Sequence, residues 1–287
     1  MLRLALATSS KYPNLTEDDR LLLDPLARHG IQAQPAIWND AAFDWSTCAA
    51  VVLRSCWDYH LQPDKFLNWI AQLESAHIPV FNPAPLIRWN ANKSYLRDLD
   101  AKGIAIVSTV WPEDNIDLLD TMRTAGWHKA VIKPRISATA YRTQLVTTAN
   151  AATAQPVFED LHRGPGVMLQ KFMDAIVTEG EWSLMFFGGT FSHAIVKRPK
   201  HGDFRVQNDF GGTARLADPP TQVLAGATRA LQAVDPTLYA RVDGIVDNNR
   251  FLLMELELIE PMLFLSDHPE APTRFAHAIA NVLDGRT

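Results

Sequence analysis

The chain has 287 residues, of which 47% are hydrophobic and 21% are charged, a composition typical of a globular protein with a large core. Its length predicts about two domains. The 27 basic and 32 acidic residues give a net charge of −5, which disfavours nucleic acid and anionic membranes as partners.

Neither a membrane span nor a disulfide framework is visible in the sequence. No apolar run approaches the roughly 20 residues that a bilayer-spanning helix requires, and residues 2–8 are too short for a signal core. Cys48 and Cys56 have no zinc-ligand spacing, and no base can be placed beside Cys56 to make it a nucleophile. We therefore expect a cytoplasmic protein.

The first part of the chain alternates strands and helices in the doubly wound manner. We expect strands at 2–8, 31–38, 48–55 and 78–81, a helix from a capping box at Thr16 and Asp19 to near Gly30, and a second helix at 63–76. Ligands of such parallel sheets bind beyond the carboxyl ends of the strands.

Arg54 follows an apolar strand of Ala, Val and Leu, where an unpaired guanidinium is costly. Its partner can be Asp58, another acid of the protein, or the carboxylate of a substrate. The sequence leaves these alternatives open. With a substrate as the partner, Arg54 would line an acceptor pocket together with Trp57, Asp58 and Tyr59.

Two lysines mark the next part of the chain. After a proline-marked crossing at 82–90, a helix capped by an asparagine would carry Lys93 in its first turn, where a cation opposes the helix dipole. Lys133 follows the buried strand 130–132 and raises the same expectation of a bound anion. Each lysine alone is more often a solvated surface residue.

A strand at 167–172 and a hairpin at 182–199 come next. The loop after the hairpin contains Arg205 and ends at Gly211 and Gly212. A basic loop is usually only solvated, but a fork-shaped donor between glycine-bearing segments suits a moving charge clamp.

The segment 239–265 predicts a second hairpin, with strands at 241–246 and 251–259 and a polar turn at 247–249. The two-residue spacing of Glu255 and Glu257 places both on one face, and Glu260 faces the other way. Like-facing carboxylates in apolar surroundings repel each other unless a cation lies between them. The pattern therefore predicts a Mg²⁺ site, unless the strand is a wet edge strand.

Asp243 shares the face of these two carboxylates only in one hairpin register. A three-residue turn or a β-bulge places it there. A two-residue turn at Asn248 and Asn249 without a bulge would pair Asp243 with Met254 and point it away.

The order of these motifs resembles that of the ATP-grasp superfamily. R-x-D-G followed by E-x-E-x-x-E-P at 241–261 is similar to the last motif of the family. RSCWDYH, NKSYL and ELELIEP resemble the glutathione-synthetase-like branch that includes the D-cycloserine-forming cyclo-ligases. The resemblance implies a mixed α/β (α+β) ATP-grasp fold, with a doubly wound parallel α/β domain at 1–88, a lid-bearing subdomain at 89–165 and a C-terminal subdomain at 166–287.

The resemblance also implies the site residues. Around ATP it places Lys93 and Lys133 at the phosphates, Gln170, Lys171 and Met173 at the adenine, and Glu179 and Glu181 toward the ribose. The implied Mg²⁺ ligands are Asp243, Glu255 and Glu257. Stabilisation of charge during catalysis would come from Arg205 and Lys197, and the substrate side includes Gly211 and Gly212.

By this resemblance the protein is an ADP-forming ligase that activates a carboxylate with ATP as an acyl phosphate and joins it to an amine or another nucleophile. Two Mg²⁺ ions, replaceable by Mn²⁺, are expected, and both substrates are small molecules. Whether they lie on one molecule, which gives a cyclisation, stays open, and a homodimer is a family expectation alone. Two rivals also stay open: an ATP-grasp kinase, and a nucleotide-binding module without turnover, which the loop 137–140 in place of a glycine-rich lid would suit.

Overall fold

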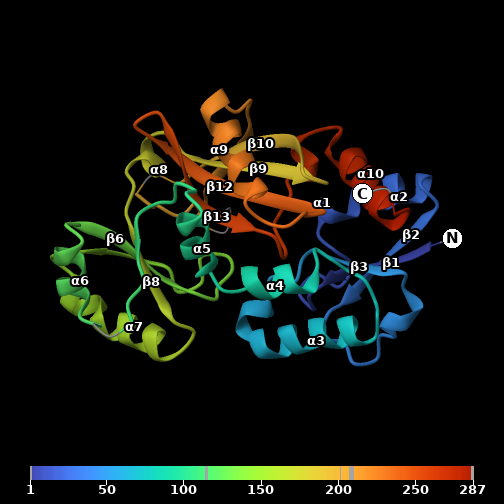
Figure 1. Ribbon diagram of the computed structural model, residues 1–287, viewed down its shortest axis with the longest axis horizontal. Coiled ribbons are helices and arrows are strands. Elements are labelled where there is room, and N and C mark those ends of the chain that lie inside the picture. The colour runs from blue at the N-terminus through green and yellow to red at the C-terminus, as the bar shows by residue number, and fades with distance from the viewer. Residues whose placement is uncertain (1, 114–115, 201, 207–209, 286–287) are drawn as a thin grey trace.

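The computed structural model describes residues 2–113, 116–200, 202–206 and 210–285. Three β-sheets with their covering helices form three units, which Figure 1 shows arranged around the middle of the molecule. Within these ranges no helix combines the length and the apolar character that crossing a bilayer requires.

The first sheet is parallel, as the doubly wound pattern predicted. Its order is β2-β1-β3-β4, with β1 at Leu2–Thr8, β2 at Ile31–Ile37, β3 at Ala50–Leu53 and β4 at Val80–Phe81. Its helices are α1 at Glu17–Arg20, α2 at Leu23–Arg28 and α3 at Pro63–Ser75. The capping box at Thr16 is confirmed, because its hydroxyl accepts the Asp19 N–H at 3.1 Å, but the predicted single helix is two short ones.

Two short helices lead away from this sheet, α4 at Ala84–Asn90 and α5 at Tyr95–Ala101. The proline-marked crossing predicted at 82–90 contains α4, and the prediction that Lys93 lies in the first turn of a helix is wrong. Asn92 does accept the N–H of Ser94 at 3.0 Å, but α5 begins only afterwards. Lys93 lies between the helices, and its N–H donates to the Arg135 carbonyl of the second unit at 2.7 Å.

The second sheet is antiparallel in the order β5-β8-β6-β7, with β5 at Thr109–Val110, β6 at Lys129–Pro134, β7 at Gln144–Thr147 and β8 at Val167–Lys171. The helices α6 at Leu118–Thr124 and α7 at Ala151–Arg163 share its core. Because β8 pairs with β6, we place the boundary predicted after residue 165 at the end of β8 instead.

The third sheet is also antiparallel, in the order β11-β10-β9-β12-β13. Its strands are β9 at Glu181–Phe187, β10 at Thr190–Arg198, β11 at Thr213–Leu216, β12 at Tyr239–Asp247 and β13 at Arg250–Glu257. The helices of this part are α8 at Ala175–Thr178, α9 at Thr221–Gln232 and α10 at Ala271–Leu283. Helix α9 packs against one face of this sheet, and α10 packs beside α2, so that β1 and α10 lie on the same side of the molecule in Figure 1.

The hairpin of β12 and β13 turns in two residues, because Asp247 pairs with Arg250. Asn248 and Asn249 have φ values of 48° and 60°, the left-handed conformation of a tight hairpin turn. The predicted three-residue turn through Asp247 is therefore wrong. Asparagine tolerates this conformation better than most residues, which makes the short turn accessible without glycine.

A β-bulge provides the register that the carboxylates need. Asp243 pairs with Glu255, and the next pair, which begins at Gly244, skips Met254. Glycine is required beside the bulge, since a Cβ at Gly244 would lie 2.3 Å from Cζ of Phe251. The bulge was one of the two geometries that the sequence allowed, and it places Asp243 opposite Glu255.

Asn82 fastens the first unit to the third sheet. Its buried side chain donates to the carbonyls of Tyr239 at 2.9 Å and Leu258 at 2.8 Å, and its Oδ1 accepts the Leu238 N–H at 2.7 Å. One amide group thus satisfies three backbone groups at the base of β12 and after β13.

We expect Asn82→Ala to lower the free energy of unfolding by about 3 kcal/mol or more, because each buried backbone group left unsatisfied costs about 1–3 kcal/mol. Urea denaturation measures the loss. The matched control is Asn68→Ala on the exposed side of α3, which should change stability little. Equal stability of the two variants would contradict the role of Asn82.

Candidate active site

A cleft of about 520 Å³ is lined by residues of all three units, and its volume lies in the usual range of small-molecule sites. The first unit contributes Ser9, Lys11, Tyr12, Trp57, Asp58, Tyr59, His60 and Leu61. Lys93, Lys133, residues 137–140, Gln170 and Lys171 line another part of it. The third sheet and the chain after it contribute Glu181, Lys197, Arg241, Asp243, Glu255, Glu257 and Glu260.

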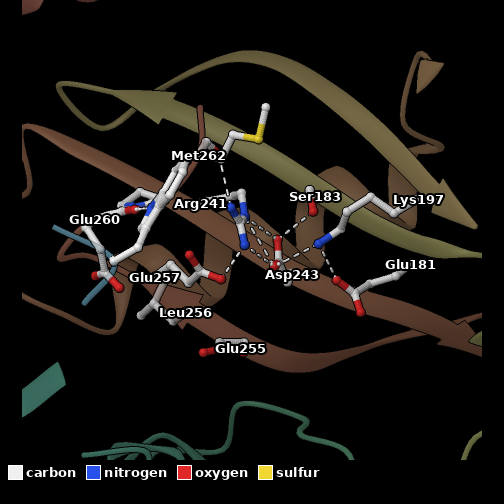
Figure 2. A network of polar contacts seen from close by, with 12 residues as sticks. Glu181, Ser183, Lys197, Arg241, Asp243, Glu255, Leu256, Glu257, Glu260 and Met262 are labelled. Carbon is white, nitrogen blue, oxygen red and sulfur yellow. Dashed lines mark hydrogen bonds and ion pairs between the residues drawn. The ribbon is translucent and has the colours of Figure 1, made fainter. Parts of the chain in front are cut away.

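A continuous series of ion pairs covers the cleft face of the third sheet, and Figure 2 shows it from close by. Lys197 of β10 lies 2.5 Å from Glu181 of β9 and 3.1 Å from Asp243 of β12. Arg241 of β12 contacts Asp243 at 2.9 Å and also pairs with Glu257 of β13. Acidic and basic groups therefore alternate across four strands. We call this series the ion-pair ladder.

The strand register creates the ladder. Lys197 stands opposite Glu181 between β10 and β9, and Arg241 stands opposite Glu257 between β12 and β13. Directly opposed side chains on one face of antiparallel strands come close enough to pair. Asp243 lies between the two pairs and also accepts a hydrogen bond of 2.6 Å from the Ser183 hydroxyl, its neighbour on β9.

The pKa values of the carboxyl groups on this face are shifted in different directions. Burial alone would raise the pKa of Asp243, but Arg241 and Lys197 hold it below its ordinary value. Burial likewise opposes ionisation of Glu255, and Lys93, at 2.5 Å, lowers its pKa. At Glu257 burial prevails over Arg241, and with repulsion from Glu255 it raises the pKa to about 7.

Lys133 differs from the other lysines and the arginine described above because it pairs with an amide group instead of a carboxylate. Its ammonium donates to the Gln170 side chain at 2.7 Å, and no ion pair joins it to an acid within the described residues. Burial lowers its pKa. Lys93, by comparison, contacts both Glu255 and the Ser137 carbonyl. A half-buried lysine without a carboxylate partner is able to pair with an anion from outside the protein.

Comparison with known proteins assigns the chain to a family. Residues 4–82 match the family model described as D-cycloserine synthetase DcsG, N-terminal domain. The chain is 31% identical over 297 residues to the cycloserine biosynthesis protein DcsG of Streptomyces lavendulae, an alignment that covers 98% of each chain. The chain belongs to the DcsG family of ATP-grasp ligases.

Solved structures agree with this family. The crystal structure of D-cycloserine synthetase DcsG superposes with a TM-score of 0.88 and 30% identity over 98% of this chain and 99% of that one. The ATP-grasp ligase PsnB, complexed with a minimal precursor, Mg and ADP, gives a TM-score of 0.63 at 14% identity over 99% and 97% of the chains. The ATP-grasp fold expected from the sequence is thus confirmed, and the protein is an ATP-dependent ligase.

In the structure the three predicted Mg²⁺ ligands pair with lysine and arginine side chains of the protein. Among the described residues no three acidic, histidine or cysteine side chains form a ready metal cluster. The repulsion between the carboxylates that predicted a metal is relieved by Arg241 and Lys93 instead. Glu255 and Glu257 still expose 30% and 24% of their side chains, so they fit Mg²⁺ as oxygen donors. Asp243, 4% exposed, fits only after it exchanges one of its cations.

Arg54 is not a substrate residue. Its side chain is 1% exposed and lies outside the cleft, where it pairs with Asp19 at 2.8 Å. It also donates to the carbonyls of Leu53 and, at 2.8 Å, Pro261. The protein acid that the sequence left open is thus Asp19, and Arg54 holds the chain after β13 against the first unit.

The structure places the other predicted residues in two groups. Besides Lys93, Lys133 and the three predicted metal ligands, eight line the cleft: Trp57, Asp58, Tyr59, Gln170, Lys171, Glu181, Lys197 and Arg205. Four lie outside its lining: Met173, whose side chain is buried among other apolar residues, Glu179, Gly211 and Gly212. The family resemblance implied these four residues from their positions in motifs, and a position in a motif does not determine whether a residue lines the cleft.

Arg241 and Glu260 line the cleft but were not among the site residues predicted from the sequence. Arg241 precedes Asp243 by two positions in an apolar strand, so the alternation that grouped Glu255 with Glu257 could have placed it on the same face. Glu260 was expected to face away, but the chain leaves the regular strand after Glu257, and Glu260 lines the cleft with 9% exposure. Strand periodicity does not extend beyond the end of a strand.

Glu257→Gln should lower ATP-dependent turnover by about two orders of magnitude, because it removes one charge from a site that receives cation-bound phosphates.

The stability of the protein without nucleotide should depend on pH through Glu257. Because the fold raises the pKa of Glu257 from 4.5 to about 7, its favourable protonated form is lost as the pH rises through that range. The wild-type melting temperature should therefore fall relative to that of the variant from acid to neutral pH, and parallel pH curves would contradict this.

Proposed function

We propose that this ligase uses Mg²⁺ and ATP to activate a carboxylate as an acyl phosphate and joins it to a nitrogen of the same molecule. The product would be D-cycloserine or a cyclic compound of the same type, in keeping with the name of its 31% identical relative. D-cycloserine holds a ring closed by a bond between a carbonyl carbon and a nitrogen, the bond that a carboxylate–amine ligase makes. The observation that carries the proposal is the composition of the cleft.

One part of the cleft fits the nucleotide. We assign Lys133 to the phosphates, because its half-buried side chain has no acidic partner among the described residues. Lys93 can join it once Glu255 turns to a metal ion. Gln170 and Lys171, at the end of β8, lie at the cleft lining and are assigned to the base.

The ion-pair ladder and the neighbouring Glu255 provide ligands for the metal ions and cations for the transferred phosphoryl group. We assign Glu255 and Glu257 as Mg²⁺ ligands, with Asp243 as a third ligand after cation exchange. Two Mg²⁺ ions, replaceable by Mn²⁺, match this donor set. Mg²⁺ held there would neutralise phosphate charge. Lys197 and Arg241, released from Asp243 in the exchange, would then hold the developing charge of the reaction.

The first unit supplies the organic substrate end. Trp57, Asp58 and Tyr59 of the first unit line the cleft. Asp58 accepts the indole N–H of Trp38 at 2.8 Å, which fixes the orientation of its carboxylate. A homodimer, and the exclusion of nucleic acid and membrane partners, stay predictions from the sequence.

Lys133→Ala should weaken ATP binding by about tenfold or more, on the scale of a lost charge-assisted hydrogen bond. Titration calorimetry with ATP and Mg²⁺ measures the change. Lys129→Ala is the matched control, because Lys129 lies on the same strand but its side chain is 51% exposed and does not line the cleft. Equal affinities of the two variants would refute the assignment.

Ring closure can be tested with β-aminooxy-D-alanine, which is D-cycloserine opened at its carbonyl–nitrogen bond. With ATP and Mg²⁺ the wild-type protein should form equal amounts of ADP, phosphate and D-cycloserine, detected by mass spectrometry. Added hydroxylamine should divert part of the product to a hydroxamate, which reports the acyl phosphate. Absence of ADP, or a stable phosphorylated product, would overturn the proposal.

A further inference from the structure

Glu260 is a carboxyl group of the cleft that the ion-pair ladder does not include. It follows β13 by three residues, and only 9% of the residue is exposed to solvent. Figure 2 shows it on the side of Glu257 that faces away from Arg241. It therefore lies toward the first unit, beside the part of the cleft assigned to the organic substrate.

The backbone around Glu260 is held firmly by the first unit. The indole N–H of Trp57 donates to the Glu260 carbonyl at 2.8 Å. The buried Arg54 donates to the carbonyl of the next residue, Pro261, at the same distance. These contacts fix the backbone that carries the Glu260 side chain between the first sheet and the third.

Charge pairing separates Glu260 from its neighbours. Glu181, Asp243, Glu255 and Glu257 each contact a lysine or an arginine. Within the described residues no such ion pair reaches Glu260, although a buried carboxylate without a cation is costly. A cost of this kind, in a cleft and beside a substrate pocket, is typical of a functional group.

The surroundings of Glu260 keep it protonated to a higher pH than an ordinary glutamate. Burial raises its pKa to about 8, repulsion from Glu257 adds to this, and Lys93 opposes it. Further titratable groups that face it from the packed elements are Glu255 of β13, Tyr239 of β12, and Cys56 and Tyr59 of the first unit. The last three are neutral, since burial raises the pKa of each.

We propose that Glu260 is the general base of the ligation step. This rests on the proposed function. The nitrogen lone pair forms the bond to the acyl carbon, the bond from that carbon to the phosphate oxygen breaks, and phosphate leaves with the electron pair. The proton of the attacking nitrogen moves to the Glu260 carboxylate, which later returns it to solvent through the open cleft. A base that titrates near the working pH is suited to this transfer.

Rapid-quench measurements on Glu260→Gln with ATP, Mg²⁺ and β-aminooxy-D-alanine separate the two steps. ADP formation in the first turnover should stay within about threefold of the wild type, whereas D-cycloserine formation should fall by about 10²–10⁴-fold, the usual contribution of a general base. Glu260→Asp, which keeps a carboxylate, should recover part of the loss. Glu17→Gln, with a side chain 97% exposed on α1, should match the wild type in both steps.

The pH profile gives a second readout. Ring closure by the wild type should decline toward acid pH as Glu260 is protonated, and this limb should be absent from Glu260→Gln. Equal loss of ADP and D-cycloserine formation, or unchanged ring closure, would overturn Glu260 as the base and leave the ligase function standing. A wild-type protein that forms no ADP would instead overturn the proposed function and the base with it.

Discussion

The cleft depends on the buried ion pair between Arg241 and Asp243. Asp243 is 4% exposed, so its charge is tolerable only while cations surround it. Arg241 satisfies this need and at the same time reaches Glu257 on the neighbouring strand, and Lys197 connects Asp243 to Glu181 on the other side. One arginine thereby links the charges of two strands and determines the state of the site without nucleotide.

Without nucleotide, each carboxylate of the ladder is paired with a lysine or an arginine of the protein. Each lysine or arginine of the ladder occupies carboxylate oxygens that a metal ion could use. In the proposed function, Glu255, Glu257 and Asp243 would hold Mg²⁺, and the cations that they release would be available to the phosphates of ATP. Such an exchange would keep each buried charge paired, whereas an unpaired buried charge costs several kcal/mol.

The three units bring different chemistry to the cleft, and a few polar contacts hold them together. Asn82 and Asn90 both hydrogen-bond to the backbone of the third sheet or the chain after it, so the path out of the first sheet is fastened to β12 and β13. Lys93 then bridges to the second unit through Arg135 and Ser137. Trp57 of the first unit and Lys133 of the second unit thereby line the same cleft.

The sequence by itself determined what depends on local pattern. The parallel first sheet follows from alternating apolar strands and helices, the placement of Glu255 and Glu257 on one face follows from the two-residue period, and the order of motifs identified the ATP-grasp fold. The family resemblance pointed to Lys133 at the end of a strand, and this residue does line the cleft. These features need no knowledge of distant partners.

Only the tertiary structure decided which charges meet. Asp19 lies 35 positions from Arg54 in the chain, and its pairing with that arginine removes a predicted substrate residue from the cleft. The bulge at Met254 sets the register of Asp243, because a bulge depends on the packing of Phe251 against Gly244 rather than on strand pattern. Glu260 enters the cleft because the first unit holds its backbone. Long-range contacts of this kind cannot be read from the periodicity of the sequence, because the local pattern around each residue would be the same without its partner.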